Sequence, residues 1–437
     1  MSTTTSNNEK KYTQQQLDLI SKALPADQCK YLDAEVNVYA KWWGYTVELN
    51  QKAVDILDLL LDYLDEELVP HFKVSEIRRA ISLSIQLKQF RLGNAVEGDG
   101  YVRMISPWVM PFALVVVRGA SSVNDQNLWF TVWDPDKRTW GEQAEFHECL
   151  SRNAPALAQH GDLLYCVHCG DNSDDLKWTV YSTDDGWSDD HDFPPYHSTA
   201  TNPSLVEFDN TLYCFHRGSG NQTLYYCTFD TAGKTWNKDI EVMVGNQVHS
   251  SATGCAVAVF KGELHMVYQS GQNHDLYHII FNKDTNAWRT NNKSDGGYNY
   301  PNGKTSDTPA LVAYGESLLL VHRGNKDEDM YYCTYDGTSW TKELPIDGAS
   351  SNMGPGLAVF EDKVFMVHRA KSSDGSLWYS IYDGSGWTQQ DTLIDGQSTG
   401  APPALACYTD PQCNSDNYED PKTAVARLIC VHRGWGK

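Results

Sequence analysis

The feature that most constrains this sequence is a motif that recurs along its last three-quarters, about fifty residues apart. Each copy reads as an apolar strand, a polar loop, a second aromatic strand, an acidic turn and a tryptophan. Units of this length usually bury their apolar faces against one another, so the repeat predicts a ring or a stack of similar sheets. The copies span residues 114–140, 164–187, 212–236, 264–288, 318–340 and 364–387, with a partial seventh at 428–434.

The repeat predicts a mainly β protein built as a propeller of four-stranded antiparallel blades. A further strand precedes the copies and often begins at a proline, as at Pro203 and Pro309, and four strands at this period are typical of a propeller blade. We predict seven blades within residues 93–437, with six as the alternative if the terminal strands pair differently. The last copy lacks its two outer strands, so we expect N-terminal strands, including residues 101–105, to pair with the C-terminal blade and close the ring.

The N-terminal part is predicted to be different. Residues 1–12 are polar and are expected to form a disordered tail, and residues 13–92 are expected to form an α-helical bundle. Thr13 begins a capping box, a second helical pattern covers residues 27–43, and residues 54–68 carry one apolar stripe at helical spacing. The bundle is expected either to cap the ring or mediate oligomerisation, or to act as an effector or membrane-perturbing module with a protein partner.

The charge of the chain excludes some partners. The 57 acidic and 35 basic residues give a net charge of −22, which repels phosphate backbones and anionic lipids and argues against nucleic acid. The first residues form no apolar signal peptide, and no stretch predicts a transmembrane segment. The odd number of cysteines, 11, favours a reducing compartment, so we expect a cytoplasmic protein or one secreted without a signal peptide.

Two patterns in the repeat resemble those of known families. The acidic turns at residues 182–187, 230–236, 336–340 and 383–387 look like degenerate Asp-boxes of sialidase-like propellers, in which the aspartate accepts backbone hydrogen bonds. His-Arg-Gly at the end of the second strand, followed by Leu-Trp-Tyr or Leu-Tyr-Tyr, resembles the seven-bladed fucose-binding lectins of insect-pathogenic bacteria and, more distantly, tachylectin-like propellers. The resemblance covers residues 107–437 only. It implies glycan or glycoprotein partners, with a host-interaction or toxin role.

The end of the second strand is also where ligand chemistry is expected. An arginine offers a planar fork for hydroxyls or a carboxylate, and an aromatic ring offers a stacking surface for a sugar. The same residues could instead form hydrogen bonds between blades, and a histidine buried at a strand end is more often satisfied than functional. The candidate ligand-binding residues are Arg118, His216, Arg217, His322, Arg323, His368, Arg369, His432, Arg433, Trp129, Trp178, Tyr225, Tyr331 and Trp378. Tyr277 occupies the same third-strand position in the remaining copy.

Neither a cofactor nor a catalytic group is predicted. Paired carboxylates cannot be placed from the sequence, so a glycoside hydrolase is a weaker alternative than a non-catalytic, multivalent lectin or a protein-interaction scaffold that presents the helical domain. No metal site is expected, because Cys166 and Cys169 lie three apart on a strand and should face opposite sides. The acidic residues at 184–192 are more typical of a solvated loop than of a calcium site. Residues 408–424 form a long insertion in the last copy.

Overall fold

The computed structural model describes residues 36–41, 44–50, 101–107, 115–117, 125–182, 186–271, 273–292, 299–371, 375–410 and 425–435. These residues form strands, turns and loops, and none of them is helical. The chain divides into two compact units, one comprising Met1–Ser121 with Thr183–Trp187 and the other comprising Ser122–Ser182 with Ser188–Lys437. Within the described residues, no helix is long and apolar enough to cross a membrane.

The described part of the smaller unit is an antiparallel sheet in the order β1-β2-β3-β4. The alternation of Val36, Val38 and Val47 with polar residues suits a strand better than a helix, so the helix predicted over residues 27–43 is wrong from 36 to 41. Within the predicted tail at 1–12 and the predicted bundle at 13–92, the structure describes only residues 36–41 and 44–50. The rest of both predictions lies outside the described residues. The strands are β1 (Val36–Lys41), β2 (Gly44–Asn50), β3 (Tyr101–Pro107) and β4 (Val115–Val117).

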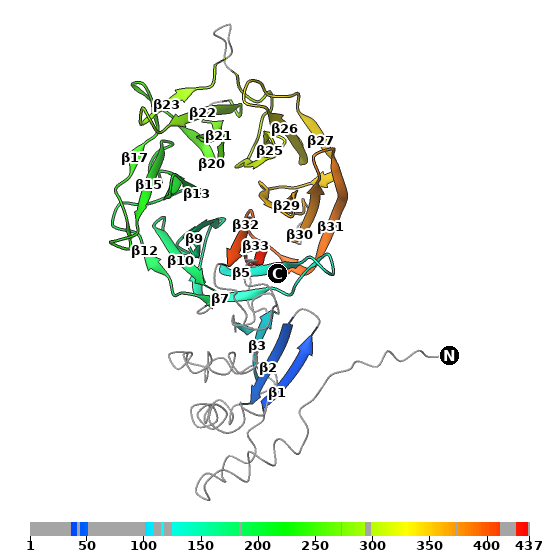
Figure 1. Ribbon diagram of the computed structural model, residues 1–437. Coiled ribbons are helices and arrows are strands. Elements are labelled where there is room, and N and C mark those ends of the chain that lie inside the picture. Colours follow the sequence, from blue (N-terminus) through cyan, green and yellow to red (C-terminus); the bar gives the residue numbers. More distant parts are fainter. Residues whose placement is uncertain are drawn as a thin grey trace, which may run out of the picture. The chain divides into compact units, whose positions relative to one another are not determined.

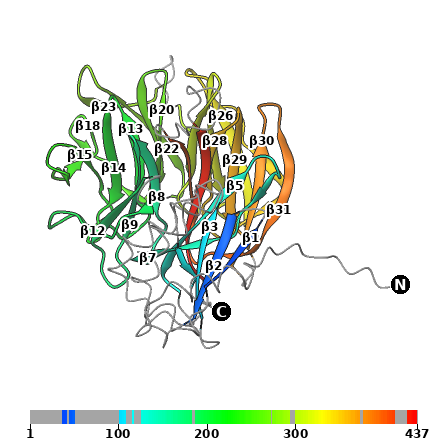
Figure 2. The same ribbon diagram turned by 60° about the horizontal axis from the view of Figure 1, so that its bottom comes forward.

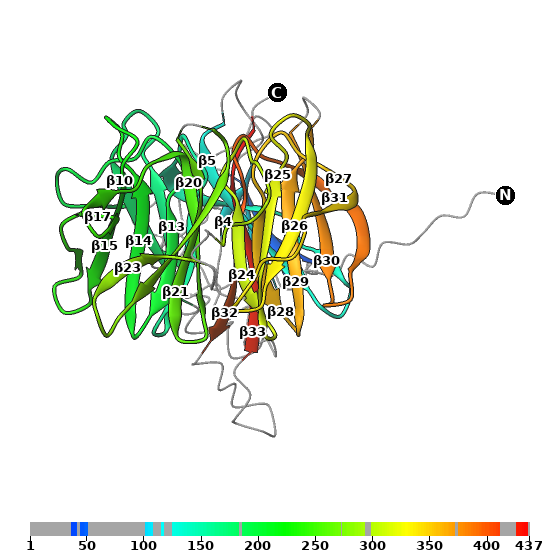
Figure 3. The same ribbon diagram turned by 90° about the horizontal axis from the view of Figure 1, so that it is seen from above.

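The larger unit is a β-propeller of six sheets, which we name blades A to F in the order of their first strands. The first strands surround the axis and contact one another in a closed cycle of six (Figure 1). Viewed from the side, the strands of neighbouring blades run along the ring axis (Figure 3). The first strands are β8 (Ala156–His160), β13 (Ser204–Phe208), β20 (Ser251–Phe260), β24 (Ala310–Tyr314), β28 (Gly356–Phe360) and β32 (Ala404–Asp410).

The second and third strands of each blade form an antiparallel hairpin outside the first strand. The second strands are β9 (Leu163–Cys169), β14 (Thr211–Arg217), β21 (Glu263–Ser270), β25 (Ser317–Arg323), β29 (Lys363–Arg369) and β33 (Val425–Arg433). The third strands are β10 (Leu176–Ser182), β15 (Leu224–Asp230), β22 (Leu276–Asn282), β26 (Asp329–Tyr335), β30 (Ser376–Tyr382) and β5 (Asn127–Asp134).

The outer edge of each blade is one strand or several short ones. Blades D and E end in β27 (Leu344–Ser350) and β31 (Trp387–Ser398). In blades A, B, C and F the edge strands are β11 (Gly186–Trp187), β12 (His191–Asp192), β16 (Thr235–Trp236), β17 (Ile240–Glu241), β18 (Met243–Val244), β19 (Gln247–Val248), β23 (Ala287–Thr290), β6 (Thr139–Trp140) and β7 (Ala144–Leu150).

The prediction of seven blades is wrong, and the alternative of six holds. The first and the last copies of the repeat are two halves of one blade, because β5 pairs with β33 over Leu128–Val132 and Ile429–Arg433. The two ends of the propeller chain therefore meet inside blade F (Figure 2). Residues 101–105, expected to close the ring, instead pair with β2 and β4 in the smaller sheet. Closing a ring inside one sheet removes the two edges that an open sheet would expose.

Clusters of buried apolar side chains fill the interfaces between neighbouring blades from A–B round to E–F. Between blades B and C, Phe215 and Leu224 pack against Met266 and Ile279, and equivalent clusters lie between A and B, C and D, D and E, and E and F. The tryptophan that closes the repeat is part of this core in four blades, as Trp140, Trp236, Trp288 and Trp340, and Trp236 is only 2% exposed. Because the apolar faces of a blade are buried against its neighbours, the blades stabilise one another and the folding of the ring is cooperative.

The acidic turn between the third strand and the edge is held by its aspartate. The Oδ1 of Asp336 accepts backbone N–H bonds from Thr338 at 2.6 Å and Ser339 at 2.7 Å. These bonds, together with one from the Thr338 hydroxyl, lower the pKa of Asp336 to about 2. Asp383 accepts the backbone N–H groups of Ser385 and Gly386 in the same way. The aspartates therefore fix the turn locally, as the pattern predicted.

Candidate functional site

The predicted site residues lie where the second and third strands of a blade pair at their shared end. In four blades a second-strand histidine lies directly opposite a third-strand aromatic, and an arginine follows the histidine. Arg118 lies outside the described residues. The pairs are His216 with Tyr225, His322 with Tyr331, His368 with Trp378 and His432 with Trp129.

Blade A keeps this register but has a lysine at the aromatic position. Lys177 lies opposite His168, and Trp178, one residue further along the strand, lies opposite Val167. Since a shift of one residue turns a side chain to the other face of the sheet, Trp178 packs in the core between blades A and B, where its ring stacks on Tyr165. Trp178, which is 8% exposed, therefore does not present the free ring face that the sequence predicted for it.

The histidines of the predicted site are buried, and most of them bind a carboxylate. His432 is the exception: its Nε2 has no hydrogen-bond partner among the described residues, and burial lowers its pKa to about 4. In the other blades with a histidine at this position, a carboxylate near the outer edge of the same blade binds Nε2 and so connects the second strand to that edge. The Nε2–carboxylate distances are 2.8 Å for His168 and Asp190, 3.0 Å for His216 and Asp239, 2.9 Å for His322 and Glu343, and 2.8 Å for His368 and Asp391.

The second ring nitrogen of two of these histidines binds the backbone. Nδ1 of His322 lies 3.1 Å from the carbonyl oxygen of Arg323, and Nδ1 of His368 lies 3.1 Å from that of Arg369. A carbonyl oxygen only accepts, so Nδ1 must donate, and Nε2 shares one proton with the carboxylate. The histidines thus serve the blade and leave the ligand to their neighbours.

The glycine of His-Arg-Gly makes room for a capping side chain. A Cβ on Gly218 would lie 2.6 Å from Oδ1 of Asn221, which accepts the N–H of Thr223 at the start of the third strand. The Nδ2 of Asn221 also donates to the hydroxyl of Tyr225 at 3.2 Å. Gly324 leaves the equivalent space for Asp327 in blade D. The polar cap therefore both starts the third strand and orients its aromatic ring.

An arginine and the aromatic of its own blade lie on opposite faces of the sheet. Arg217 lies opposite Leu224, whose side chain is in the core between blades B and C. Tyr225 lies on the other face of the strand, together with Cys227, which is in the core between A and B. Each arginine therefore faces the third strand of the next blade. The facing pairs, from the A–B interface round to F–A, are Cys169 with Tyr225, Arg217 with Tyr277, Gln269 with Tyr331, Arg323 with Trp378, Arg369 with Trp129, and Arg433 with Lys177.

Two of the four described arginines are tied to the protein. Nε of Arg369 donates to the carbonyl oxygen of Thr399 at 2.8 Å, its guanidinium lies 4.7 Å from the ring centre of Trp435, and it is 3% exposed. Nε of Arg323 donates to the carbonyl oxygen of Ser351 at 2.9 Å, and its Nη1 binds the Ser306 hydroxyl. These contacts are the bonds between blades that the sequence left open as an alternative.

The other two arginines have donors to spare. Nε of Arg433 lacks a partner among the described residues although its Nη1 donates to Gly400, and burial, against the charge of Asp125, lowers its pKa. Nε of Arg217 likewise lacks a partner in the part of the chain that the structure describes. Arg217 is half-buried and faces Tyr277, also half-buried, whose ring stacks on Tyr300 with centres 4.7 Å apart. The B–C interface thus combines a guanidinium and a tyrosine pair.

Sequence reasoning missed the residues that complete these interfaces. The carboxylates follow their histidines by 21 to 23 positions, a spacing that the sequence contains. A buried serine or threonine also stands at or just before the start of every first strand, and its hydroxyl accepts a backbone N–H in the turn there. These linker residues, Ser151, Thr199, Ser251, Thr305, Ser351 and Thr399, number six and so report the number of blades directly.

Comparison with known proteins identifies similar structures but no family. No protein-family model matches the chain, and no curated protein matches it in sequence. The similar structures include AofleA from Arthrobotrys oligospora, with 14% identity and a TM-score of 0.47 over 66% of this chain and 88% of that one. They also include the six-bladed fungal lectin of Aleuria aurantia, with 11% identity and a TM-score of 0.44 over 69% of this chain and 93% of that one.

A more distant match is an exo-β-1,3-galactanase from Phanerochaete chrysosporium, with 10% identity and a TM-score of 0.38 over 50% of this chain and 57% of that one. All these likenesses are weak in sequence and in superposition. We therefore base the function on the side chains at the blade interfaces.

Proposed function

We propose that this protein is a non-catalytic, carbohydrate-binding β-propeller lectin whose sugar sites lie between neighbouring blades. The observation that carries the proposal is at the B–C interface. Arg217 brings a guanidinium whose Nε lacks a protein partner to the side of blade B that faces Tyr277. A partly buried polar group without a partner costs free energy, which a ligand oxygen would recover.

The two groups together suit a sugar. A guanidinium fork can donate two parallel hydrogen bonds to neighbouring hydroxyls or to a carboxylate. A tyrosine face covers the apolar C–H side of a sugar ring, and its stacking on Tyr300 holds it in one orientation. Since the two side chains come from different blades, rigid packing of the blades presets the distance between them, which lowers the ordering cost of binding.

The six interfaces are unequal, and this affects how many sites the ring offers. Arg369 is buried beneath Trp435 and Arg323 is bound to two linkers, so their donors are already occupied. At the A–B and C–D interfaces, Cys169 and Gln269 replace the arginine. We propose that B–C is the principal site and that any multivalency comes from the weaker interfaces or from association of several chains.

A hydrolase is disfavoured by the state of the carboxylates. The acids that the repeat places between blades, Asp190, Asp239, Glu343 and Asp391, are each bound to a buried histidine. A glycosidase needs one protonated and one ionised carboxyl group on either side of the substrate. Carboxyl groups already hydrogen-bonded to a buried histidine are poorly placed to act as this pair on a substrate.

The finer expectations from the sequence remain part of this proposal. They are the fucose-binding type of the lectins of insect-pathogenic bacteria, the descent of the turns from Asp-boxes, a host-interaction or toxin role, a protein partner for the N-terminal part, and export without a signal peptide. The repeated Gly-Asx cap and the turn aspartates support a common ancestral blade. They do not specify the sugar.

A glycan array with the full chain tests the proposal. We expect saturable binding to a restricted set of glycans, with competition by the corresponding free monosaccharide. Silence across neutral, fucosylated and acidic glycans would overturn it in favour of a protein-interaction scaffold. Release of free sugar from a bound glycan would overturn the non-catalytic part.

A further inference from the structure

The interfaces between blades share one more position, which lies on the outer edge of each blade. At this edge, one residue pairs with the third strand two residues before the position opposite the second-strand histidine. These edge residues are Leu150, Ser198, Ser250, Lys304, Ser350 and Ser398, and the position of interest is the residue immediately before each of them. In a propeller this side chain faces the next blade at the level of its second-strand histidine. The six residues at this position are Cys149, His197, His249, Gly303, Ala349 and Gln397.

The residues at most of these positions already bind or pack against the next blade, or leave room for it. His249 binds the hydroxyl of Tyr268 in blade C, and Gln397 donates to the carbonyl oxygen of Gly141 at 2.7 Å. Gly303 has no side chain because a Cβ there would lie 2.6 Å from Nε2 of His322. Ala349 adds only a methyl group to the apolar core.

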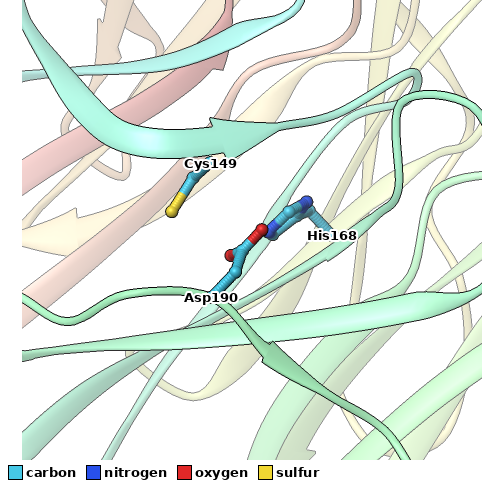
Figure 4. Close-up of side chains that lie close together, drawn as sticks. All are labelled: Cys149, His168 and Asp190. Carbon is cyan, nitrogen blue, oxygen red and sulfur yellow. The ribbon is translucent and has the colours of Figure 1, made fainter.

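The F–A interface is different because it combines three kinds of metal ligand. Cys149 on β7 faces His168 on β9 and Asp190 in the loop before β12, and their ligand atoms lie within 4.8 Å of one another. Figure 4 shows the thiol of Cys149 directed towards the carboxylate of Asp190, which in turn lies against the ring of His168. Cys149 and His168 are both 0% exposed. The three ligands come from two blades and lie far apart in the sequence, which is why the sequence suggested no metal.

We propose that Cys149, His168 and Asp190 bind one thiophilic divalent cation, zinc being the ion that this donor set suits best. Thiolate, imidazole and carboxylate are the three side chains that zinc takes in proteins. Bond lengths of about 2.0 to 2.3 Å in a tetrahedral site require ligand atoms about 3.3 to 3.7 Å apart. The present His168–Asp190 distance of 2.8 Å would therefore open by roughly half an ångström.

The second nitrogen of His168 supports this assignment. A metal-bound histidine usually donates its other N–H to a backbone carbonyl, which fixes the ring. Nδ1 of His168 faces the carbonyl oxygen of Cys169 at 3.4 Å, leaving Nε2 directed at the cluster. Cys166, two residues before His168 and on the same face of β9, also has a buried free thiol.

A second cluster of the same ligand types serves as the matched control. His197, Cys227 and Asp239 also lie within 4.8 Å of one another at the A–B interface. However, Nδ1 of His197 lies 2.8 Å from the carbonyl oxygen of Pro194, and Nε2 lies 2.7 Å from that of Asn237. Both nitrogens must donate, so this ring has no lone pair for a metal. In the F–A cluster, Nε2 of His168 is hydrogen-bonded only to Asp190 among the described residues, and Asp190 is itself a proposed ligand, so a cation can take the place of the proton that the two side chains share.

A bound cation would act on the part of blade F that is least regular. The pairing of β7 with β5 shifts register between Asn127 and Trp129, and Cys149 lies within the shifted stretch. A metal bond from Cys149 to blade A would fix this bulge and join the closing blade to its neighbour. The role would be structural, since the site is buried and no open path to it is needed for turnover.

Cobalt titration of the chelator-treated full chain tests the proposal. We expect one Co²⁺ per chain, a thiolate-to-cobalt charge-transfer band, displacement by Zn²⁺ and a rise in Tm with Zn²⁺. Cys149→Ser should remove the band, and Asp190→Asn, which keeps the shape of the side chain, should lower the affinity about tenfold or more. Cys227→Ser should leave both unchanged. Absence of a saturable band, or a band that persists in Cys149→Ser with circular dichroism showing a folded chain, would overturn the proposal.

Discussion

Glu343 accepts a hydrogen bond from Nε2 of His322 at 2.9 Å, in the space left open by the missing side chain of Gly303. The first two residues belong to blade D and the third to blade C. The His322–Glu343 pair thus links the second strand of blade D to its outer edge. It also requires that blade C have a residue without a side chain at position 303. Variants of the same arrangement occur at neighbouring interfaces, and they explain which repeat residues are structural and which are left for a ligand.

The Gly303→Ala substitution should destabilise the ring. The new Cβ would overlap Glu343 and press on Nε2 of His322, so the buried pair would have to separate or the blades move apart. We expect a loss of about 1 to 3 kcal/mol in the free energy of unfolding, measured by urea denaturation. Gly386→Ala, where an added Cβ meets nothing within 4 Å, is the control and should be near neutral. Equal stability of the two variants would refute the contact.

Arg369→Ala should also be costly to stability. Its Nε bond to the Thr399 carbonyl and its stacking against Trp435 both lie in the E–F interface, so truncation leaves an unpaired acceptor and a cavity. We expect a loss of about 2 to 3 kcal/mol, visible as a lower Tm. Arg217→Ala should change the free energy of unfolding by no more than about 0.5 kcal/mol. A melting curve of Arg369→Ala that matches the wild type would show that this arginine is no strut.

Stability should fall at alkaline pH because of His197. Burial opposes its charge, but hydrogen bonds with Cys227, Pro194 and Asn237 and the charge of Asp239 outweigh that effect and raise the pKa to about 9. The folded pKa lies above the unfolded value, so the contribution is complete below about pH 6.5 and is lost as the pH rises through about 9. It is on the order of 2 to 3 kcal/mol.

Urea denaturation between pH 6 and pH 10 measures this loss. His197→Gln, which cannot gain a proton, should remove most of the decline in that range. A decline of the same slope in the variant would mean that other groups cause it.

A second pair of histidines should make the ring sensitive to acid. Nε1 of Trp340 donates to Nδ1 of His278 at 3.1 Å, so Nε2 of His278 donates in turn to Nδ1 of His265 at 2.9 Å. This chain needs neutral rings, and burial lowers the pKa of His265 to about 4. The folded pKa lies below the unfolded one, so the contribution is present above about pH 6.5 and is lost as the pH falls towards 4.

Tryptophan fluorescence at graded urea concentrations follows this loss, since Trp340 belongs to the network. His265→Gln should flatten the dependence between pH 6.5 and pH 4 relative to the wild type. If the two profiles coincide, the network is not the acid-sensitive element.

The propeller could be predicted from the sequence, but the number of blades was overcounted. The six tryptophan-ended copies correspond to the six blades, whereas the partial copy at residues 428–434, counted as a seventh, contains most of the second strand of blade F and pairs with the third strand from the first copy. The capped linker residues such as Thr199 and Thr305 occur once per interface and would have given six. In the smaller unit, the alternation of Val36 and Val38 indicates a strand that the helical pattern over residues 27–43 obscured.

The candidate site was predictable in composition and not in geometry. The sequence identifies an arginine and an aromatic in four of the blades, but only the pairing register shows that Arg217 and Tyr225 lie on opposite faces. It also shows that Trp178 is offset by one residue in blade A. Whether a guanidinium is occupied depends on linkers some thirty residues away, such as Thr399 for Arg369. Contacts of this range leave no local pattern.

The affinity of Arg217 and Tyr277 variants for a glycan selected on the array tests the central claim most directly. Arg217→Ala and Tyr277→Ala should each weaken binding about tenfold or more, because a charged hydrogen bond or a stacking face is lost, with the Tm of Arg217→Ala unchanged. Arg289→Ala, which removes an exposed arginine paired with Glu263 on blade C, should bind like the wild type. Unaltered affinity in both site variants would contradict a sugar site between blades B and C.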